Sequence, residues 1–212
     1  MKKPAALIFF LLSGFLSFSQ SDSGFRIHQG ILAGVGTVGV GRMPATGILN
    51  AYITGSLEYY TEKNISIRGD GYYFVNSLSG GSPLTQNSSI YFGAFYHFNT
   101  HSAFDPFIGV QPGASVTRML AVDFYGNNAA YSDNAEVCPL ASVVAGFNFY
   151  GDRWFHIRFD VRYTAGWYLA PGSASGLVLP DDYNISELSF NFGLGWNLDV
   201  YSRQKRNKNI TP

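Results

Sequence analysis

Hydrophobic and polar residues alternate without interruption from Phe155 to Trp167. Aromatic and aliphatic side chains take every second position, and mostly charged or small residues lie between them. Only an extended strand places successive side chains on opposite faces, so one long strand with an apolar and an ionic face is predicted. A strand rises about 3.3 Å per residue, so even at a tilt of roughly 45° it crosses a hydrocarbon layer of about 30 Å. The pattern therefore favours a membrane β-barrel.

The same alternation predicts seven further strands. The clearest are Glu187–Val200, Leu49–Tyr60 and Ser89–Phe98. The weaker ones are Arg26–Gly41, Asn64–Val75, Pro106–Leu120 and Val137–Tyr150. An even number of strands is typical of bacterial outer-membrane barrels. The predicted fold class is therefore all-β, an eight-stranded antiparallel up-and-down transmembrane β-barrel.

The connections between these strands alternate in length. The short ones are Glu62–Lys63, Asn99–Asp105 and Gly151–Trp154. The others, mostly longer, lie near Arg42–Ile48, Asn76–Ser88, Ala121–Glu136 and Tyr168–Ser186. Outer-membrane barrels have short periplasmic turns and longer external loops. Both termini of the barrel are therefore expected on the periplasmic side.

Alternation alone also fits a soluble eight-stranded barrel with apolar residues inside. Composition distinguishes the two interpretations. Charged residues make up 13% of the chain and aromatic residues 17%. The surface of a soluble protein carries about 25–35% charged residues. Trp154 and Phe155 at one strand end, and Trp167 and Tyr168 at the other, resemble the aromatic girdles of membrane interfaces. Both features favour apolar faces turned toward lipid.

The first residues read as a secretory signal peptide. Lys2 and Lys3 precede an apolar run, and small residues precede Gln20. We expect a signal peptide over 1–19, the outer-membrane barrel over 20–201 and a basic periplasmic tail over 202–212. A permanent membrane helix would need about 20 apolar residues, more than this run supplies. Nothing forms a basic stripe with interleaved aromatics, so nucleic-acid binding is not expected, and no cofactor is predicted.

The last predicted strand carries a recognisable spacing. Asn191, Gly193, Trp196 and Leu198 follow the order polar, glycine, hydrophobic, hydrophobic. In this the chain resembles the small bacterial outer-membrane β-barrel proteins of the OmpA, OmpX and OmpW type, over the whole mature barrel. The resemblance implies that these four residues are an assembly signal read by the barrel-assembly machinery. It also implies a setting in outer-membrane lipid and lipopolysaccharide.

Turning the polar faces inward places seven charged residues in the lumen. They are Glu58, Arg68, Asp70, Arg158, Asp160, Arg162 and Glu187. An eight-stranded interior is only wide enough for side chains, and buried charges need partners. We therefore expect a salt-bridge network that plugs the barrel; a charged constriction in a narrow ion-conducting channel is the alternative.

Three histidines are predicted at the short-turn ends of their strands. His28, His97 and His156 fall on the apparent inward faces, with Asp199 at the same level. Imidazoles and a carboxylate bind transition metals, but a polar barrel floor is the favoured reading, and no metal is predicted. A lipid-modifying enzyme would need a base beside a nucleophile at the external end, where no histidine is expected.

The function predicted from the sequence is structural or interactive rather than catalytic. The expected contributions are membrane integrity, or adhesion to an extracellular ligand through loops around Val122–Glu136 and Leu169–Ile185. These loops contain more acidic than basic residues. Divalent-cation bridging to lipopolysaccharide is one form that such an interaction would take.

Overall fold

The computed structural model describes residues 27–80, 82, 84–98, 102–122, 128–131, 135–168 and 183–200. The strands are β1 (Ile31–Arg42), β2 (Leu49–Tyr60), β3 (Ile65–Ser77), β4 (Leu84–His97), β5 (Phe104–Val122), β6 (Asn128–Tyr131), β7 (Glu136–Tyr150), β8 (Phe155–Tyr168), β9 (Tyr183–Asn184) and β10 (Glu187–Asp199). The signal peptide and the basic tail predicted at the two termini lie outside these residues. Among the described residues, no helix has the length and apolar character needed to span a bilayer.

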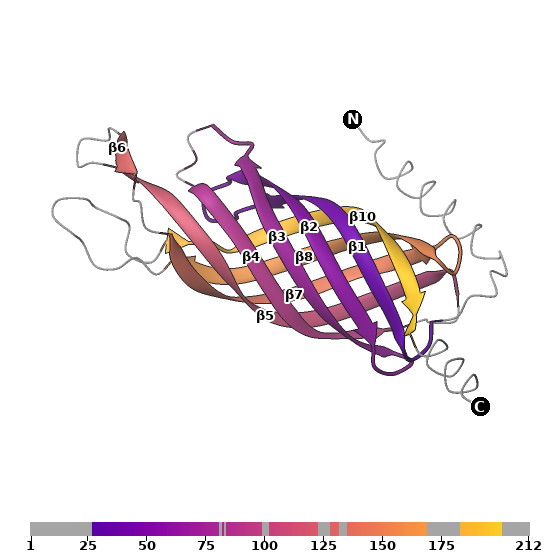
Figure 1. Ribbon diagram of the computed structural model, residues 1–212. Helices are drawn as coiled ribbons and strands as arrows, with labels where there is room; N and C mark the ends of the chain where they lie inside the picture. The colour runs from indigo at the N-terminus through magenta and orange to yellow at the C-terminus, as the bar shows by residue number, and fades with distance from the viewer. Residues whose placement is uncertain are drawn as a thin grey trace, which may run out of the picture.

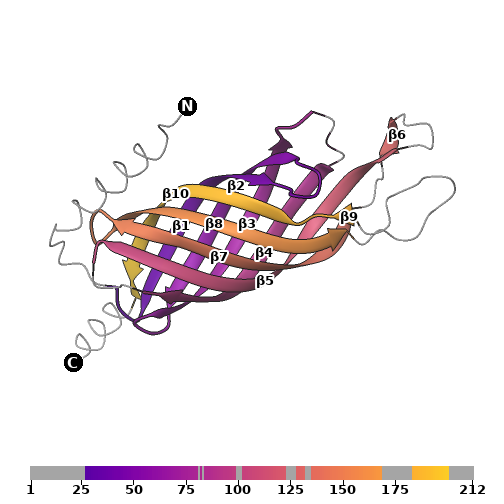
Figure 2. The same cartoon turned by 180° about the vertical axis from the view of Figure 1, so that it is seen from behind.

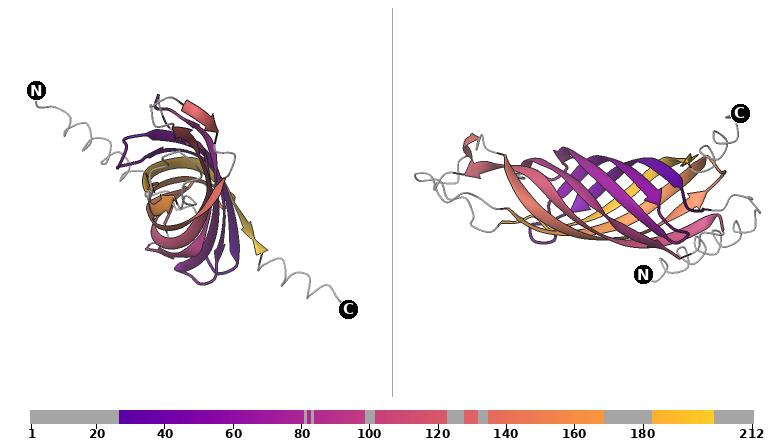
Figure 3. Two further views of the ribbon diagram at one scale, coloured as in Figure 1. Left: turned by 90° about the vertical axis from the view of Figure 1, so that its left-hand side faces the viewer. Right: turned by 60° about the horizontal axis from the view of Figure 1, so that its bottom comes forward.

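Eight long strands form one closed antiparallel barrel (Figure 1). Each long strand pairs with the next long strand in the chain, and the short β6 and β9 lie outside this order. The strand β10 closes the ring by pairing with β1 from Ile31↔Asp199 to Arg42↔Leu188. Figure 2 shows β7, β8 and β10 on the opposite wall of the barrel. The left view of Figure 3 is seen from one end of the barrel. Closure pairs the edge strands, which a hydrocarbon setting requires.

Apolar side chains cover the outside of this barrel. Val38, Leu57, Ile90 and Phe92 are each more than 60% exposed, although they lie in the middle of paired strands. On β8, by contrast, Arg158 and Arg162 are 1% exposed. Apolar outside and polar inside is the pattern of a transmembrane barrel. The predicted fold class, with its apolar faces outward, is confirmed.

The apolar band is as tall as a membrane core. Trp196 and Trp154 are exposed near one end, and Trp167 is exposed at the other. Phe155 and Trp167 are twelve steps apart on β8, so at about 3.3 Å per residue and a tilt near 45° they are separated by roughly 28 Å along the barrel axis. The predicted position of Tyr168 in a girdle is wrong, because its side chain points into the lumen and is 2% exposed. Strict alternation requires this, because its neighbour Trp167 faces out.

Two strand boundaries differ from the sequence prediction by more than two residues. The first strand begins at Ile31 rather than Arg26, because Gly30 adopts a φ of 89° and turns the chain. The strand predicted from Ser89 begins at Leu84, which removes about half of the loop predicted over Asn76–Ser88. Residues 85–88 are polar on both faces, so hydrophobic alternation cannot detect that part of the strand.

The two ends of the barrel differ in their connections. At the short-turn end, residues 61–64, 98–103 and 151–154 join successive strands, and β1 begins and β10 ends there. The long-loop end carries the links 43–48 and 78–83, the segment with β6 and the segment with β9. Residues 123–127, 132–134 and 169–182 of the predicted loops lie outside the described residues. The links 43–48 and 78–83 are as long as the link 98–103, so the predicted difference in length between the two ends depends on the segments with β6 and β9.

The outward orientation of Val38 gives a direct test. We expect Val38→Arg to lower the free energy of unfolding from lipid vesicles by about 2–4 kcal/mol, because it places a guanidinium near the bilayer midplane. Urea titration followed by tryptophan fluorescence measures this. The control is Ala45→Arg, in the exposed turn between β1 and β2, which should change the free energy by less than about 0.5 kcal/mol. Equal effects of the two variants would contradict the assignment.

Candidate functional site: the filled lumen

The short-turn end of the lumen is closed by an apolar cluster. Ile27, Ile31, Ala33, Tyr60 and Tyr150 pack together there, and each is at most 4% exposed. Ile27 precedes β1, so the chain entering the barrel contributes to this closure. The hydroxyls of Tyr60 and Tyr150 lie 3.2 Å apart. Charged side chains begin in the layer above this cluster.

The next layer joins two acids, an arginine and a histidine. Arg158 Nη2 donates to Glu58 Oε2, and Arg158 Nε donates to Asn148 Oδ1 at 2.9 Å. The ring of His97 lies between two carboxylates, with Nε2 2.9 Å from Glu58 Oε1 and Nδ1 2.7 Å from Asp105 Oδ2. Ionised carboxylates only accept hydrogen bonds, so with both acids ionised each ring nitrogen carries a proton. His97 then acts as a cation in this layer.

Within this layer, Ser66, His97 and Asp105 stand in the order of a hydrolase triad. Ser66 Oγ is 3.0 Å from His97 Nε2, and Asp105 contacts the other ring nitrogen. However, Ser66 Oγ donates to Glu58 Oε1 at 2.5 Å, and all three side chains are fully buried. A nucleophile must reach its substrate and have a free base beside it. The geometry supports a structural role.

A second ionic layer lies further along the axis. Arg162 Nη2 donates to Asp70 Oδ2 and, at 2.7 Å, to Gln111 Oε1. Arg68 Nε is 3.1 Å from Asp70 Oδ1, so one carboxylate serves two guanidiniums. Aromatic rings complete the layer, with the Arg68 guanidinium 3.8 Å from the centre of the Phe95 ring. Cation–π contacts of this kind stabilise a desolvated cation.

Asp160 lies between the two layers. It follows Arg158 and precedes Arg162 on the inward face of β8. Its Oδ1 accepts a hydrogen bond from Asn191 Nδ2 at 2.8 Å. Five of the seven predicted lumen charges thus form ion pairs in two groups, with Asp160 between these groups on β8.

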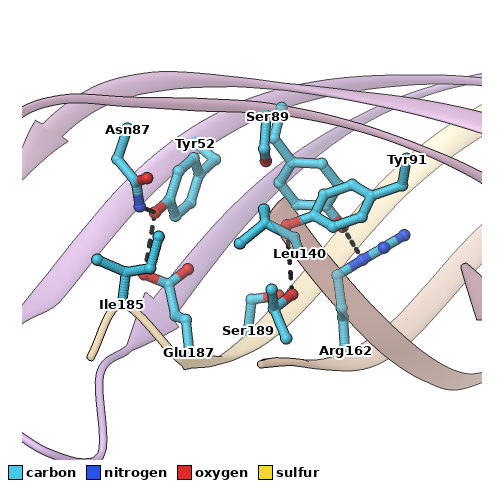
Figure 4. A pocket seen from close by; sticks show the side chains of 11 residues that line it. Tyr52, Asn87, Ser89, Tyr91, Leu140, Arg162, Ile185, Glu187 and Ser189 are labelled. Carbon is cyan, nitrogen blue, oxygen red and sulfur yellow. Dashed lines mark hydrogen bonds between the residues drawn. The ribbon is translucent and has the colours of Figure 1, made fainter. Parts of the chain in front are cut away.

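The seventh charge, Glu187, stands apart. Its Oε2 accepts hydrogen bonds from Asn50 Nδ2 at 2.7 Å and from the Tyr52 hydroxyl at 2.9 Å. The side chain is 8% exposed and lines a small cavity near the long-loop end (Figure 4). Among the described residues, no arginine, lysine or histidine lies within 4.0 Å of its carboxylate. In this structure Glu187 therefore lies apart from the two ionic layers.

Above the ionic layers, the long-loop end of the lumen is apolar. A cluster of buried residues fills it: Met43, Ile48, Tyr52, Tyr72, Phe74, Leu84, Tyr91, Met119, Cys138, Leu140, Tyr168 and Ile185. The rings of Tyr72 and Tyr91 meet edge to face, with their centres 5.6 Å apart. Within the described part of the barrel, the inward faces are thus apolar at both ends and ionic in the middle.

His28, His97 and His156 have different surroundings. His28 is exposed and faces Asp199, with Nε2 3.5 Å from Oδ2, at the mouth of the barrel rather than inside it. His97 is engaged by its two carboxylates, and His156 packs against Tyr150 with ring centres 5.1 Å apart. No three histidine, cysteine, aspartate or glutamate side chains converge as a metal site within the described segments.

The residues of the expected assembly signal divide between the two faces of β10. Asn191 and Gly193 point into the lumen, whereas Trp196 and Leu198 are exposed on the outside. This is the parity that the spacing requires. The sequence missed the relation of Ser66, His97 and Asp105, because it placed Asp105 in a connection, whereas β5 already begins at Phe104.

Comparison with known proteins identifies the fold. No protein-family model and no curated protein sequence matches the chain. Among solved structures, the N-terminal β-barrel domain of Pseudomonas aeruginosa OprF matches with a TM-score of 0.53 at 14% identity, over 81% of this chain and 100% of that one. OprG from the same organism gives 0.56 at 14% identity, over 81% and 97%. Neisserial surface protein A gives 0.53 at 14% identity, over 82% and 99%.

The fold is therefore that of the small eight-stranded outer-membrane β-barrels of Gram-negative bacteria. The predicted fold is thus supported by these solved structures. At 14% identity the likeness extends to the fold alone, so the use of the lumen and of the loops must be argued from this chain's own residues.

Breaking the Glu58–Arg158 pair tests the ionic layers. We expect Arg158→Met to lower the free energy of unfolding by about 3–5 kcal/mol, because removing one partner leaves buried charge without compensation. The double variant Glu58→Gln/Arg158→Met should lose less than the sum of the single variants, since contacting residues couple.

The matched control for this test is Arg153→Met in the exposed turn before β8. It removes the same charge, and we expect a loss below about 1 kcal/mol. Denaturant titration of the folded barrel in lipid measures all of these variants. A loss at Arg158 no larger than that at Arg153 would show that the network does not stabilise the barrel.

Proposed function

We propose that this protein is a non-conducting outer-membrane barrel with a structural or surface-interaction role. Its termini face the periplasm, and the long-loop end faces the exterior. The short turns at the end that holds both barrel termini support this orientation. Outer-membrane lipid and lipopolysaccharide surround the apolar band, and the barrel-assembly machinery reads Asn191, Gly193, Trp196 and Leu198.

The observation that carries the proposal is the filling of the lumen. Arg68, Arg158 and Arg162 are each 1% exposed, and their guanidiniums contact acids or aromatic rings. A conducting pore needs a wet path whose lining groups release ions again. Side chains held by several hydrogen bonds do not provide one. Membrane integrity and contacts made by the external loops remain as the roles that such a barrel serves.

The adhesive role would fall to the loops at the long-loop end. Neisserial surface protein A, one of the similar structures, is named as a surface protein. A rigid filled barrel is a suitable base for loops, because binding residues are commonly carried on loops positioned by a rigid scaffold. An extracellular ligand held by those loops, with acidic side chains bridged to lipopolysaccharide by divalent cations, is the form of interaction that we propose.

Two other functions receive less support. A narrow ion channel would use the charged lumen, but apolar clusters lie beyond the ionic layers at both ends. A lipid-modifying enzyme would need an accessible catalytic group, whereas Ser66 and His97 are 0% exposed. We therefore assign no catalytic activity to the barrel.

Conductance across a planar bilayer tests the proposal. We expect the refolded wild-type barrel to show no steady channel current, because the ionic layers block the axis. The quadruple variant Glu58→Ala/Asp70→Ala/Arg158→Ala/Arg162→Ala should admit water and raise the current. The control is a variant with shortened external loops and an unchanged lumen, which should conduct no more than the wild type. Stable single-channel steps from the wild type would refute the plug and establish the channel.

A further inference from the structure

The buried charges of the lumen do not balance within the described chain. The buried acids are Glu58, Asp70, Asp105, Asp160 and Glu187, and the buried cations are Arg68, Arg158 and Arg162, together with His97 when it carries both ring protons. Glu58, Asp70 and Asp105 form ion pairs with these cations, and Asp160 lies between Arg158 and Arg162 on β8. Glu187 is left over. Burying an isolated ionised carboxylate is costly unless something compensates its charge.

The hydrogen bonds around Glu187 favour its ionised form. Asn87 Nδ2 donates to the Tyr52 hydroxyl at 3.1 Å, and that hydroxyl donates to Glu187 Oε2. Upstream, Thr117 Oγ1 donates to Asn87 Oδ1 at 3.0 Å. Every donor in this chain points toward the carboxylate, and Asn50 adds a further one. A relay of aligned donors strengthens each of its hydrogen bonds to an anion.

A second group beside the carboxylate also lacks a partner. Asn50 is 0% exposed, and its Oδ1 accepts no hydrogen bond. Glu187 Oε1 lies over Gly41, where a Cβ would overlap it, so the missing side chain makes the space that this oxygen occupies. The Asn50 oxygen and the Glu187 carboxylate are therefore neighbouring buried acceptors.

The cavity lined by Glu187 is small. It has a volume of about 20 Å³ and is lined by polar oxygens of Glu187, Ser189 and Thr164, with Ile185 and Leu140 as apolar walls (Figure 4). This volume holds one water-sized particle. Arg162 also lines it, but its N–H groups are directed to Asp70, Gln111, Ser142 and Tyr72. A water would satisfy hydrogen bonds here without compensating the charge.

We propose that this cavity binds one compact monovalent cation, which enters from the long-loop end. The ligands are the Glu187 carboxylate and the hydroxyls of Ser189 and Thr164, three residues that line the cavity. One carboxylate with neutral oxygens suits sodium, potassium or ammonium better than a divalent ion, which needs six or more oxygen ligands or several carboxylates. The cation completes the charge balance of the lumen.

The test compares chloride salts at equal ionic strength. The refolded barrel in detergent is heated in sodium, potassium or ammonium chloride, or in N-methyl-D-glucamine chloride, whose cation is too large for the cavity. A ligand that binds only the folded state raises the midpoint with its concentration. We expect a rise of about 5 °C over a hundredfold increase in at least one compact cation, and none in N-methyl-D-glucamine.

Two variants locate the effect. Glu187→Gln keeps the shape of the side chain and removes its charge, and it should abolish the dependence on the cation. Glu62→Gln removes the same charge from an exposed turn at the other end and should leave the dependence intact. Sodium-23 line broadening should disappear with Glu187→Gln alone, which gives a readout independent of unfolding.

Two results would overturn the proposal. Identical midpoints for wild type in all four salts would show that Glu187 is buried as the neutral acid. A cation dependence that survives in Glu187→Gln would place the site elsewhere. Neither result affects the expected bilayer conductance. The cation site and the proposal of a non-conducting lumen are therefore tested separately.

Discussion

Every backbone N–H and C=O group inside hydrocarbon must find its partner within the protein, and the barrel meets this requirement through the pairing of β10 with β1. Closure with eight strands fixes a narrow lumen. Each inward side chain is then close to side chains from strands far away in the sequence. Arg158 reaches Glu58 across the barrel, although 100 residues separate them. The ionic layers are thus a consequence of closure, and they keep the lumen filled.

The sequence was sufficient for strands whose two faces differ strongly. The pattern from Phe155 to Trp167 gave β8 to within one residue, and that from Glu187 gave β10 to within one residue. It missed residues 84–88 of β4, which are mostly polar on both faces, and it extended the first strand to residues before Ile31, where a turn at Gly30 precedes the strand. Hydrophobic alternation arises where one face of a strand contacts lipid. It therefore does not detect the parts of strands that extend beyond the lipid.

The same rule divides the candidate site. Parity along each strand predicted correctly that Arg158, Asp160 and Arg162 point inward, and register made Glu58 and Arg68 cross-strand neighbours. Parity says nothing about partners. Arg68 pairs with Asp70 on its own strand rather than with Glu58. Pairing depends on the curvature of the wall and on the reach of each side chain across it, and neither is written in a one-dimensional pattern.

Inward glycines explain how so narrow a lumen holds three arginines. A Cβ at Gly109 on β5 would overlap the ring of Phe95 on β4, and this ring lies under the Arg68 guanidinium. Gly41 makes the equivalent space for the Glu187 carboxylate. An absent side chain on one strand thus determines where a large one from its neighbour can lie, because protein interiors are close-packed. The positions of the buried charges are therefore set by the backbone as much as by their ionic partners.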